Sequence, residues 1–335
     1  MLETSNTTSK RDSYMDLVCG LLIVYMIIYH AYLLCNLSDL LSITLDKIFF
    51  FFMPWFYYKS GMFYTKHNTK EIAISGIKKY IYPFVIYTII GECFLWFFTM
   101  YKEENINLFS LLFSSIKCII VQGSTIGNQP LWFLVSLYIT KVIVSFLDNK
   151  NVSIVISSFF SCIIAWASSY VGAYINDVFC IPYLIMSTSL GIFYYEMGFL
   201  LRDIQYNKVV FMIAIFIYLF VWVQIPSQVD VRLGMLKYGN WFVFVISSLA
   251  GIIIINNLSR IRLLQLPFLI NVGSNSLTYY CFHWILFNIV ISFCSIISGY
   301  RLLIVLFLLA LIILPLYTYW VFLLKKKYSQ YTIYL

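Results

Sequence analysis

The sequence predicts an all-α polytopic membrane protein with about ten transmembrane helices and both termini in the cytoplasm. Of the 335 residues, 62% are hydrophobic and only 11% are charged, a composition typical of membrane proteins. Apolar stretches of about 20 residues, the length that crosses a bilayer core of about 30 Å, recur along the whole chain. Because no connection is long enough for a soluble domain, residues 1–335 are expected to form a single integral-membrane domain.

Ten stretches have the length of a membrane span. They run over residues 14–35, 44–65, 80–100, 130–148, 152–171, 180–201, 208–225, 239–257, 275–298 and 301–324. The first follows Lys10 and Arg11, as the apolar part of a signal peptide would, but it is too long for that part and no small-x-small cleavage site follows it. The further stretch 107–121 contains Lys117 and two serines, so we expect either an interfacial or re-entrant helix there or an eleventh span.

The distribution of lysine and arginine predicts the orientation of these spans. With a cytoplasmic N-terminus, sixteen of the 22 basic residues face the cytoplasm and six face the outside, in agreement with the positive-inside rule. The net charge of +8 is then explained by topology and by anionic lipid headgroups. The expected partner is therefore the lipid bilayer, and nucleic acid is not expected.

Metal and phosphate-loop chemistry are not expected. The eight cysteines lie mostly inside apolar stretches and form no C-x-x-C pair, so we interpret them as small hydrophobic residues. The histidines, His30, His67 and His283, are too scattered for a metal site, and the sequence contains no glycine-rich phosphate-binding loop.

His30 lies deep inside the first stretch, where an imidazole is costly to keep unless it has a function. On a helix, Cys19 and Asp16 share the face of His30, at offsets of about 20° and 40°. Asp16 is roughly 21 Å from His30 along the axis, too far to orient the imidazole as the acid of a triad would. The face therefore predicts an access channel from the cytoplasm. The alternative is that His30 bonds to a carbonyl of a neighbouring helix and only stabilises packing.

Other polar side chains inside the spans are weaker candidates. His283 is as consistent with a hydrogen-bonded core histidine as with a functional one. Glu92 and Glu196 lie within apolar stretches, where a carboxyl group is expected to have a partner. Lys59 is close enough to the inner interface for its ammonium group to reach the headgroups.

Lys78 and Lys79 precede the sequence Tyr80-Ile81-Tyr82-Pro83 at the cytoplasmic side. Such a pair usually enforces topology. The alternative is that the two lysines hold the phosphates of an anionic cytoplasmic cosubstrate as point charges.

Five motifs in this order resemble the integral-membrane acyltransferases of family 3, which include polysaccharide O-acetyltransferases and the fucose-4-O-acetylase-like and intercellular-adhesin-type proteins. Asp16 through His30 is similar to the opening motif of the family. The others are Phe52-Met53-Pro54-Trp55-Phe56 with Ser60-Gly61, Tyr80-Ile81-Tyr82-Pro83-Phe84, Pro130-Leu131-Trp132-Phe133-Leu134, and Gly273-Ser274-Asn275-Ser276-Leu277 through His283. The resemblance covers nearly the whole chain. It departs at Cys19, where the family commonly has a basic residue.

The resemblance implies a membrane-bound O-acyltransferase of the bacterial cytoplasmic membrane, that is, a plasma-membrane protein. Its cosubstrate would be acetyl-CoA or another acyl-CoA, and its acceptor a hydroxyl of a cell-surface or lipid-linked carbohydrate. His30 would be the catalytic base or nucleophile. The remaining implied site residues are His283 for catalysis, Lys78, Lys79, Arg11, Asp16 and Lys59 for the cosubstrate, and Trp132, Glu92, Tyr279 and Tyr280 for the acceptor. The sequence is compatible with a homo-oligomer.

Two other classes of function compete with this interpretation. A membrane transporter that exports a polysaccharide or its precursor should contain interrupted spans in two related halves, and no such internal repeat is present. A glycan polymerase should contain a large polar outer loop, whereas the longest outer segment, roughly 101–129, is modest.

Overall fold

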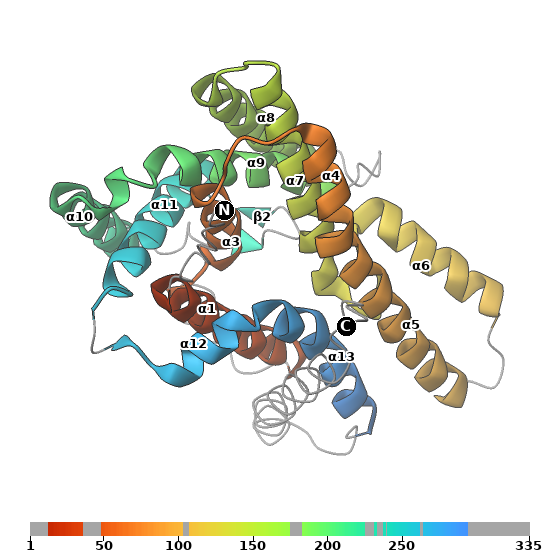
Figure 1. The fold of residues 1–335 in the computed structure, drawn as a ribbon. Coiled ribbons are helices and arrows are strands. Elements are labelled where there is room, and N and C mark those ends of the chain that lie inside the picture. The colour runs from red at the N-terminus through yellow and green to blue at the C-terminus, as the bar shows by residue number, and fades with distance from the viewer. Residues whose placement is uncertain are drawn as a thin grey trace, which may run out of the picture.

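The computed structural model describes residues 13–35, 48–102, 107–174, 183–224, 231–232, 237–238, 240–261 and 264–293. These residues form a helical bundle (Figure 1). The helices are α1 (Ser13–Cys35), α3 (Phe52–Met62), α4 (Thr69–Gly76), α5 (Tyr82–Lys102), α6 (Leu108–Gln122), α7 (Trp132–Asn149), α8 (Ile154–Tyr174), α9 (Tyr183–Leu201), α10 (Lys208–Gln224), α11 (Trp241–Leu258), α12 (Pro267–Ser274) and α13 (Ser276–Phe293). Short strands β1 (Val231–Arg232) and β2 (Lys237–Tyr238) pair antiparallel.

Every predicted span except 301–324, which lies outside the described residues, contains a described helix. Among the described residues, four helical segments are long and apolar enough to cross a membrane: Ser13–Ala31, Thr69–Met100, Gln129–Asn149 and Trp241–Leu258. Shorter apolar helices cover parts of the stretches 107–121, 152–171, 208–225 and 275–298. The structure therefore has the all-helical, apolar character predicted for a membrane protein, and the number of ten spans stays a prediction.

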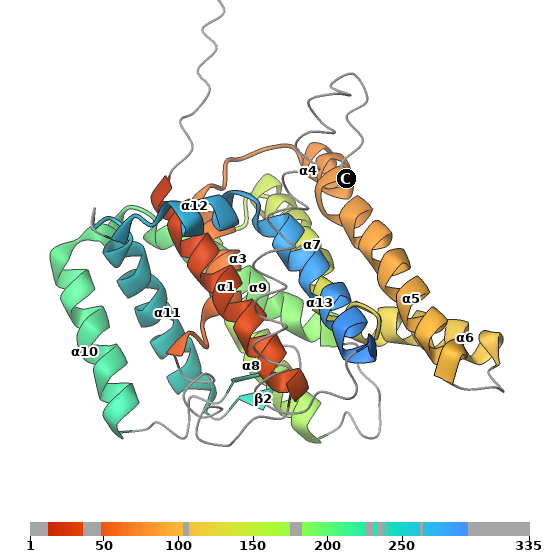
Figure 2. The same ribbon diagram turned by 90° about the horizontal axis from the view of Figure 1, so that it is seen from below.

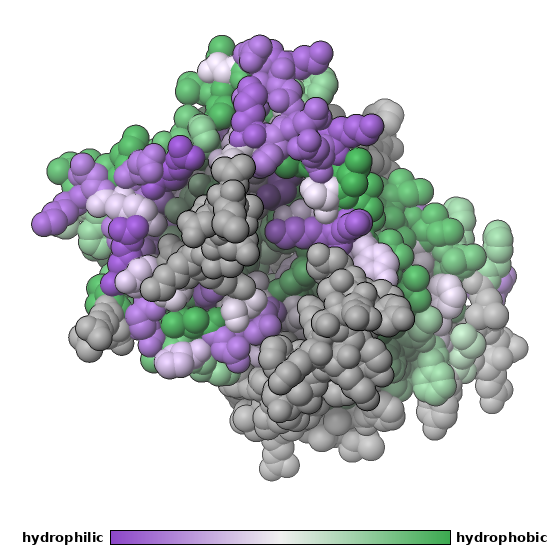
Figure 3. Space-filling view, in the orientation of Figure 1, coloured by the Kyte–Doolittle hydropathy of each residue, from purple (hydrophilic) through white to green (hydrophobic). Residues whose placement is uncertain are grey.

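One end of the bundle gathers several connections that the sequence assigned to the cytoplasm. The Asn149 amide donates to the carbonyl of His67 at 3.1 Å, and Asn257 donates to the carbonyl of Gln205 at 2.8 Å. Lys66 forms an ion pair with Asp148 at the same end, at 3.1 Å. Figure 2 shows the start of α1, α12 and α4 at this end, and β2 and α6 at the opposite end. Hydrophilic side chains gather on the face that this end presents in Figure 3.

The helix that carries Lys78 and Lys79 begins well before the predicted residue 80. Helical structure runs from Thr69 through α4, the π-helical segment η1 (Ile77–Ile81) and α5. Pro83 explains the π-helical segment, because its ring cannot donate a backbone hydrogen bond and clashes with the carbonyl four residues earlier. Lys78 and Lys79 both lie on this widened turn.

The stretch 107–121 folds as α6, which lies at the edge of the bundle beside α5, toward the end opposite α12 (Figure 2). Its large exposed side chains recur at helical spacing and would face lipid, namely Phe109, Leu112, Phe113, Ile116 and Ile120. The helix ends at Gly123 in the left-handed conformation, with φ of 77°, which glycine adopts without strain. This arrangement favours the interfacial alternative over an eleventh span.

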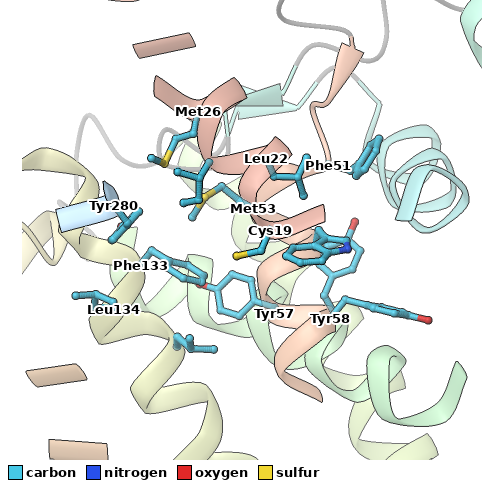
Figure 4. Close-up of a cluster of buried hydrophobic side chains, with 14 of the residues drawn as sticks. Cys19, Leu22, Met26, Phe51, Met53, Tyr57, Tyr58, Phe133, Leu134 and Tyr280 are labelled. Carbon is cyan, nitrogen blue, oxygen red and sulfur yellow. The ribbon is translucent and has the colours of Figure 1, made fainter. Parts of the chain in front are cut away.

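Helix α1 contributes many side chains to the core of the bundle, and the helix it packs against most extensively is α12. A Cβ atom on Gly20 would overlap the carbonyl of Leu269, and one on Gly273 would overlap the carbonyl of Asp16. Two glycines that face each other's helix therefore bring the two backbones into contact, as small residues do between membrane helices. Figure 4 shows side chains of α1, including Cys19 and Met26, buried in the hydrophobic cluster.

Reporter insertions test the membrane crossing of the long helix Thr69–Met100. We expect a reporter at Asn68 or Asn207 to lie in the cytoplasm and one at Asn107 to lie outside. The reason is that the connections rich in lysine and arginine share the end of the bundle at which α1 starts. Insertion at the exposed Asn151, in the connection that follows α7, is a second cytoplasmic control. If Asn68 and Asn107 reported the same side, this helix would not cross the membrane.

Candidate active site

His30 and His283 are 253 residues apart in the sequence and meet in the structure. The Nδ1 atom of His30 lies 2.9 Å from the Nε2 atom of His283. Their rings are 5.1 Å apart between centroids and nearly parallel, with an angle of 7° between the planes. His283 is fully buried at 0% exposure, whereas His30 is only partly buried. His30 is therefore the more exposed member of the pair.

The hydrogen bonds of His283 determine which nitrogen atoms carry protons when both rings are neutral. Its Nδ1 atom lies 2.8 Å from the carbonyl of Tyr280 and 3.2 Å from that of Tyr279. Carbonyls only accept hydrogen bonds, so Nδ1 of His283 carries the proton and its Nε2 atom accepts. The Nδ1–H group of His30 must then donate to that Nε2. The Nε2 atom of His30 consequently has a free lone pair and can take a proton from a substrate.

Aromatic rings fix both imidazoles in place. Trp284 contacts the ring of His30 edge-on at 5.4 Å between centroids, and Tyr29 lies at 5.9 Å. Phe287 contacts the ring of His283 edge-on at 5.7 Å. The histidine pair is thus held by side chains of its own two helices, which limits the rotation of either ring.

The connection between α6 and α7 holds α13 in position beside the histidine pair. Asn128, which is fully buried, donates to the carbonyl of Cys281 at 2.9 Å, and Asn288 donates to the carbonyl of Gly127 at 3.1 Å. The Tyr280 hydroxyl donates to the carbonyl of Pro130. These bonds are made at the stretch of α13 that contains His283, so the connection fixes the height and rotation of that stretch.

Glu92 anchors the same connection from α5. One carboxylate oxygen accepts from the backbone N–H of Gly127 at 2.9 Å, and the other accepts from the Ser115 hydroxyl at 2.5 Å. A Cβ atom on Gly91 would lie 2.7 Å from the carbonyl oxygen of Gly127, so α5 and the connection touch through their backbones. The partner that the sequence predicts for Glu92 is therefore this connection. Its predicted contact with the acceptor stays a prediction.

The face of α1 that was predicted to be an access channel is filled by side chains in this structure. Cys19 and Ile23 are each 1% exposed, and Met26 is 0% exposed. Asp16 is also buried, in the first turn of α1 beside α12. Asp16 and His30 lie on one continuous helix, so the helical rise separates them by roughly 21 Å along the axis. In this structure the face contributes to the core and does not open a passage to His30.

The predicted cosubstrate residues are spread over several elements. Lys78 and Lys79 are exposed on the π-helical segment. Lys59, on α3, is partly buried, with its ammonium group 5.2 Å from the centroid of the Trp55 ring. Arg11 lies outside the described residues.

The predicted acceptor residues differ in exposure. Tyr279 and Tyr280 are 1% and 6% exposed, and the Tyr280 ring packs edge-on against Phe133. Both rings are covered, so neither offers a free stacking surface for a sugar in this structure. Trp132 is partly exposed at the start of α7 and remains the accessible aromatic side chain of the predicted set.

Sequence reasoning missed Trp284 and Asn128. Trp284 directly follows His283, and this adjacency is the signal that could have identified it. Asn128 directly precedes the Gln129-Pro130 pair before α7, a pattern of turn residues that does not by itself reveal a tertiary contact. Within the described part of the chain, no group of three or more histidine, cysteine, aspartate or glutamate side chains could hold a metal ion.

Comparison with known proteins finds no protein-family model, no curated protein and no solved structure that matches this chain.

Replacement of Glu92 tests whether it anchors the connection. Glu92→Ala leaves the buried N–H of Gly127 and the Ser115 hydroxyl without their acceptors, so it should destabilise the fold by about 1–3 kcal/mol. Thermal unfolding of the purified protein measures this loss. Cys93→Ala, an exposed neighbour on the same helix, should leave the melting temperature unchanged. An unchanged melting temperature in Glu92→Ala, with activity lost, would instead favour a role in acceptor binding.

Proposed function

We propose that this protein transfers an acyl group, usually acetyl, from a cytoplasmic acyl-coenzyme A to a hydroxyl of a cell-surface or lipid-linked carbohydrate. The observation that carries the proposal is the hydrogen bond between His30 and His283. This bond leaves the Nε2 atom of the partly exposed His30 ring as a base. The Nε2 atom of His283 accepts from the other side of that ring and is oriented by the bond of His283 to the carbonyl of Tyr280. The ordered motifs from Asp16 to His283 that resemble family 3 acyltransferases support the same function.

His30 acts as the general base. Its Nε2 atom takes the proton of the acceptor hydroxyl while the hydroxyl oxygen attacks the thioester carbonyl. The C–S bond then breaks, and the thiolate of coenzyme A leaves with the proton that His30 carries. The products are the ester and the free thiol, and the imidazole returns to its neutral form.

His283 positions His30 and stabilises it when it is protonated. Because the Nε2 atom of His283 accepts from Nδ1 of His30, it fixes the tautomer in which the opposite nitrogen is basic. The bond from His283 to the carbonyl of Tyr280 prevents the reverse tautomer. The arrangement has the same logic as a catalytic triad, with a backbone carbonyl in place of the carboxylate.

Replacement of His30 tests the mechanism. His30→Ala should reduce acyl transfer by at least the ~10²–10⁴-fold typical of lost general acid–base catalysis. Analysis of the acyl groups on the cell's glycans, with membrane abundance measured in parallel, checks this. His67→Ala is the matched control, because His67 is exposed and bonds to Thr65, and it should retain wild-type transfer. A His30→Ala protein that inserts normally and still decorates glycans fully would rule out the mechanism and favour an exporter.

Three replacements of His283 separate its positioning role from packing. His283→Gln can place an amide oxygen near the former Nε2 atom and accept from His30, whereas the shorter His283→Asn cannot. We expect Gln to retain more activity than Asn or Ala, with losses of about 10–100-fold for the latter two. His30→Ala with His283→Ala should be no less active than His30→Ala alone, because His283 acts through His30. Additive losses would show that His283 acts independently.

A further inference from the structure

Two lysine side chains from different helices meet at one buried tyrosine. The ammonium nitrogen of Lys79, on the π-helical segment, lies 5.6 Å from the centroid of the Tyr80 ring. That of Lys141, on α7, lies 6.0 Å from the same centroid and 5.6 Å from that of the Tyr195 ring. Tyr80 and Tyr195 are 7% and 2% exposed. The cluster therefore has two cations and two buried aromatic rings, contributed by three helical elements.

Among the described residues, neither cation has an opposite charge beside it. Within the described part of the chain, no carboxylate lies within ion-pair distance of Lys79 or Lys141, and the Asp148 carboxylate on α7 is paired with Lys66. Aromatic faces attract cations only weakly compared with an anion. Lys79 is exposed to solvent, but the partly buried ammonium group of Lys141 in this state has an unfilled requirement for negative charge.

The position of Lys141 distinguishes it from a lysine that marks topology. It lies eight residues before the end of α7 at Asn149, roughly 12 Å along the axis from the hydrophilic end of the bundle. A lysine that only enforces topology is expected at the headgroups, where water and lipid phosphates solvate it. Lys141 is instead only partly exposed and lies against two rings.

We propose that Lys79 and Lys141 bind the phosphate groups of one anionic ligand beside Tyr80. Lysine suits this role because it binds phosphate as a compact point charge with three donors. Lys79, exposed on the widened π-helical turn, provides the outer contact, and the partly buried Lys141 provides the inner one. Lys141 thereby adds an inner contact to the exposed pair Lys78 and Lys79, for which the sequence leaves open a role in phosphate binding.

Two ligands carry this chemistry, the acyl-coenzyme A of the proposed function and an anionic phospholipid headgroup. Only the assignment of acyl-coenzyme A as the ligand rests on the proposed function. The geometry is compatible with it: Trp132, at the start of α7, is nine residues from Lys141, roughly 14 Å along the axis. Pro130, two residues before Trp132, bonds to Tyr280 near the histidine pair. A ligand anchored at Lys141 would therefore have to extend along about this length of α7 to place a thioester near His30.

The test compares Lys141→Met, which keeps the length of the side chain without its charge, with Lys141→Arg, which keeps the charge. Lys150→Met is the matched control, because Lys150 follows α7 and its ammonium group also lies over a ring, 5.8 Å from the centroid of Phe146. The first measurement is the affinity of the purified full chain for coenzyme A and for adenosine 3′,5′-bisphosphate. The second is its melting temperature in nanodiscs of phosphatidylglycerol against nanodiscs of phosphatidylcholine.

If coenzyme A is the ligand, Lys141→Met and Lys79→Met should each weaken its binding about tenfold or more, while Lys141→Arg and Lys150→Met bind as the wild type does. If a phospholipid headgroup is the ligand, coenzyme A affinity should stay unchanged and Lys141→Met should lose the stabilisation by phosphatidylglycerol. Equal behaviour of Lys141→Met and wild type in both measurements would overturn the anion site, even if acyl transfer is intact. A Lys141-dependent lipid effect in a protein that transfers no acyl group would retain the anion site and overturn the proposed function.

Discussion

The contact between α1 and α12 determines where the two histidines meet. Gly20 and Gly273 remove the side chains that would hold these helices apart, so that each backbone lies against the other. Helix α12 passes directly into α13 through Asn275, and the position of α12 therefore sets the start of α13. From that start, His283 is two helical turns away and reaches His30 at hydrogen-bonding distance. A larger side chain at either glycine would shift both helices and separate the pair.

The histidine pair also shows how a basic group can be prepared in an apolar surrounding without a buried charge. A carboxylate behind His283 would have to be desolvated together with its partner. The carbonyl of Tyr280 performs the same orienting function as a neutral acceptor. The chain of hydrogen bonds from His30 to the backbone of α13 can therefore be neutral throughout, which suits a site surrounded by tryptophan, tyrosine and phenylalanine rings.

Helix α7 connects the two sites that we propose. The connection before it, anchored to α5 by Glu92 and to α13 by Asn128, fixes one end beside the histidine pair. Further along the same helix, Lys141 meets Lys79 at Tyr80. Because a helix of this length transmits position as a rigid element, the spacing between the two sites is set by the backbone of α7. Helix α6 supports this arrangement through the bond from Ser115 to Glu92.

Composition and apolar stretches were sufficient to predict the helices, since a backbone in lipid must satisfy its own hydrogen bonds. They also identified His30 and His283 individually, because polar groups inside apolar stretches are conspicuous. The pairing of His30 with His283 was decided by the tertiary structure, since no local sequence pattern relates residues that are 253 positions apart. Nor could the sequence tell that Tyr279 and Tyr280 face the core, or that Lys141 meets Lys79. In a soluble helix the polar face reveals the buried one. In a membrane helix both faces are apolar, so only the packing of neighbouring helices decides which side chains are covered.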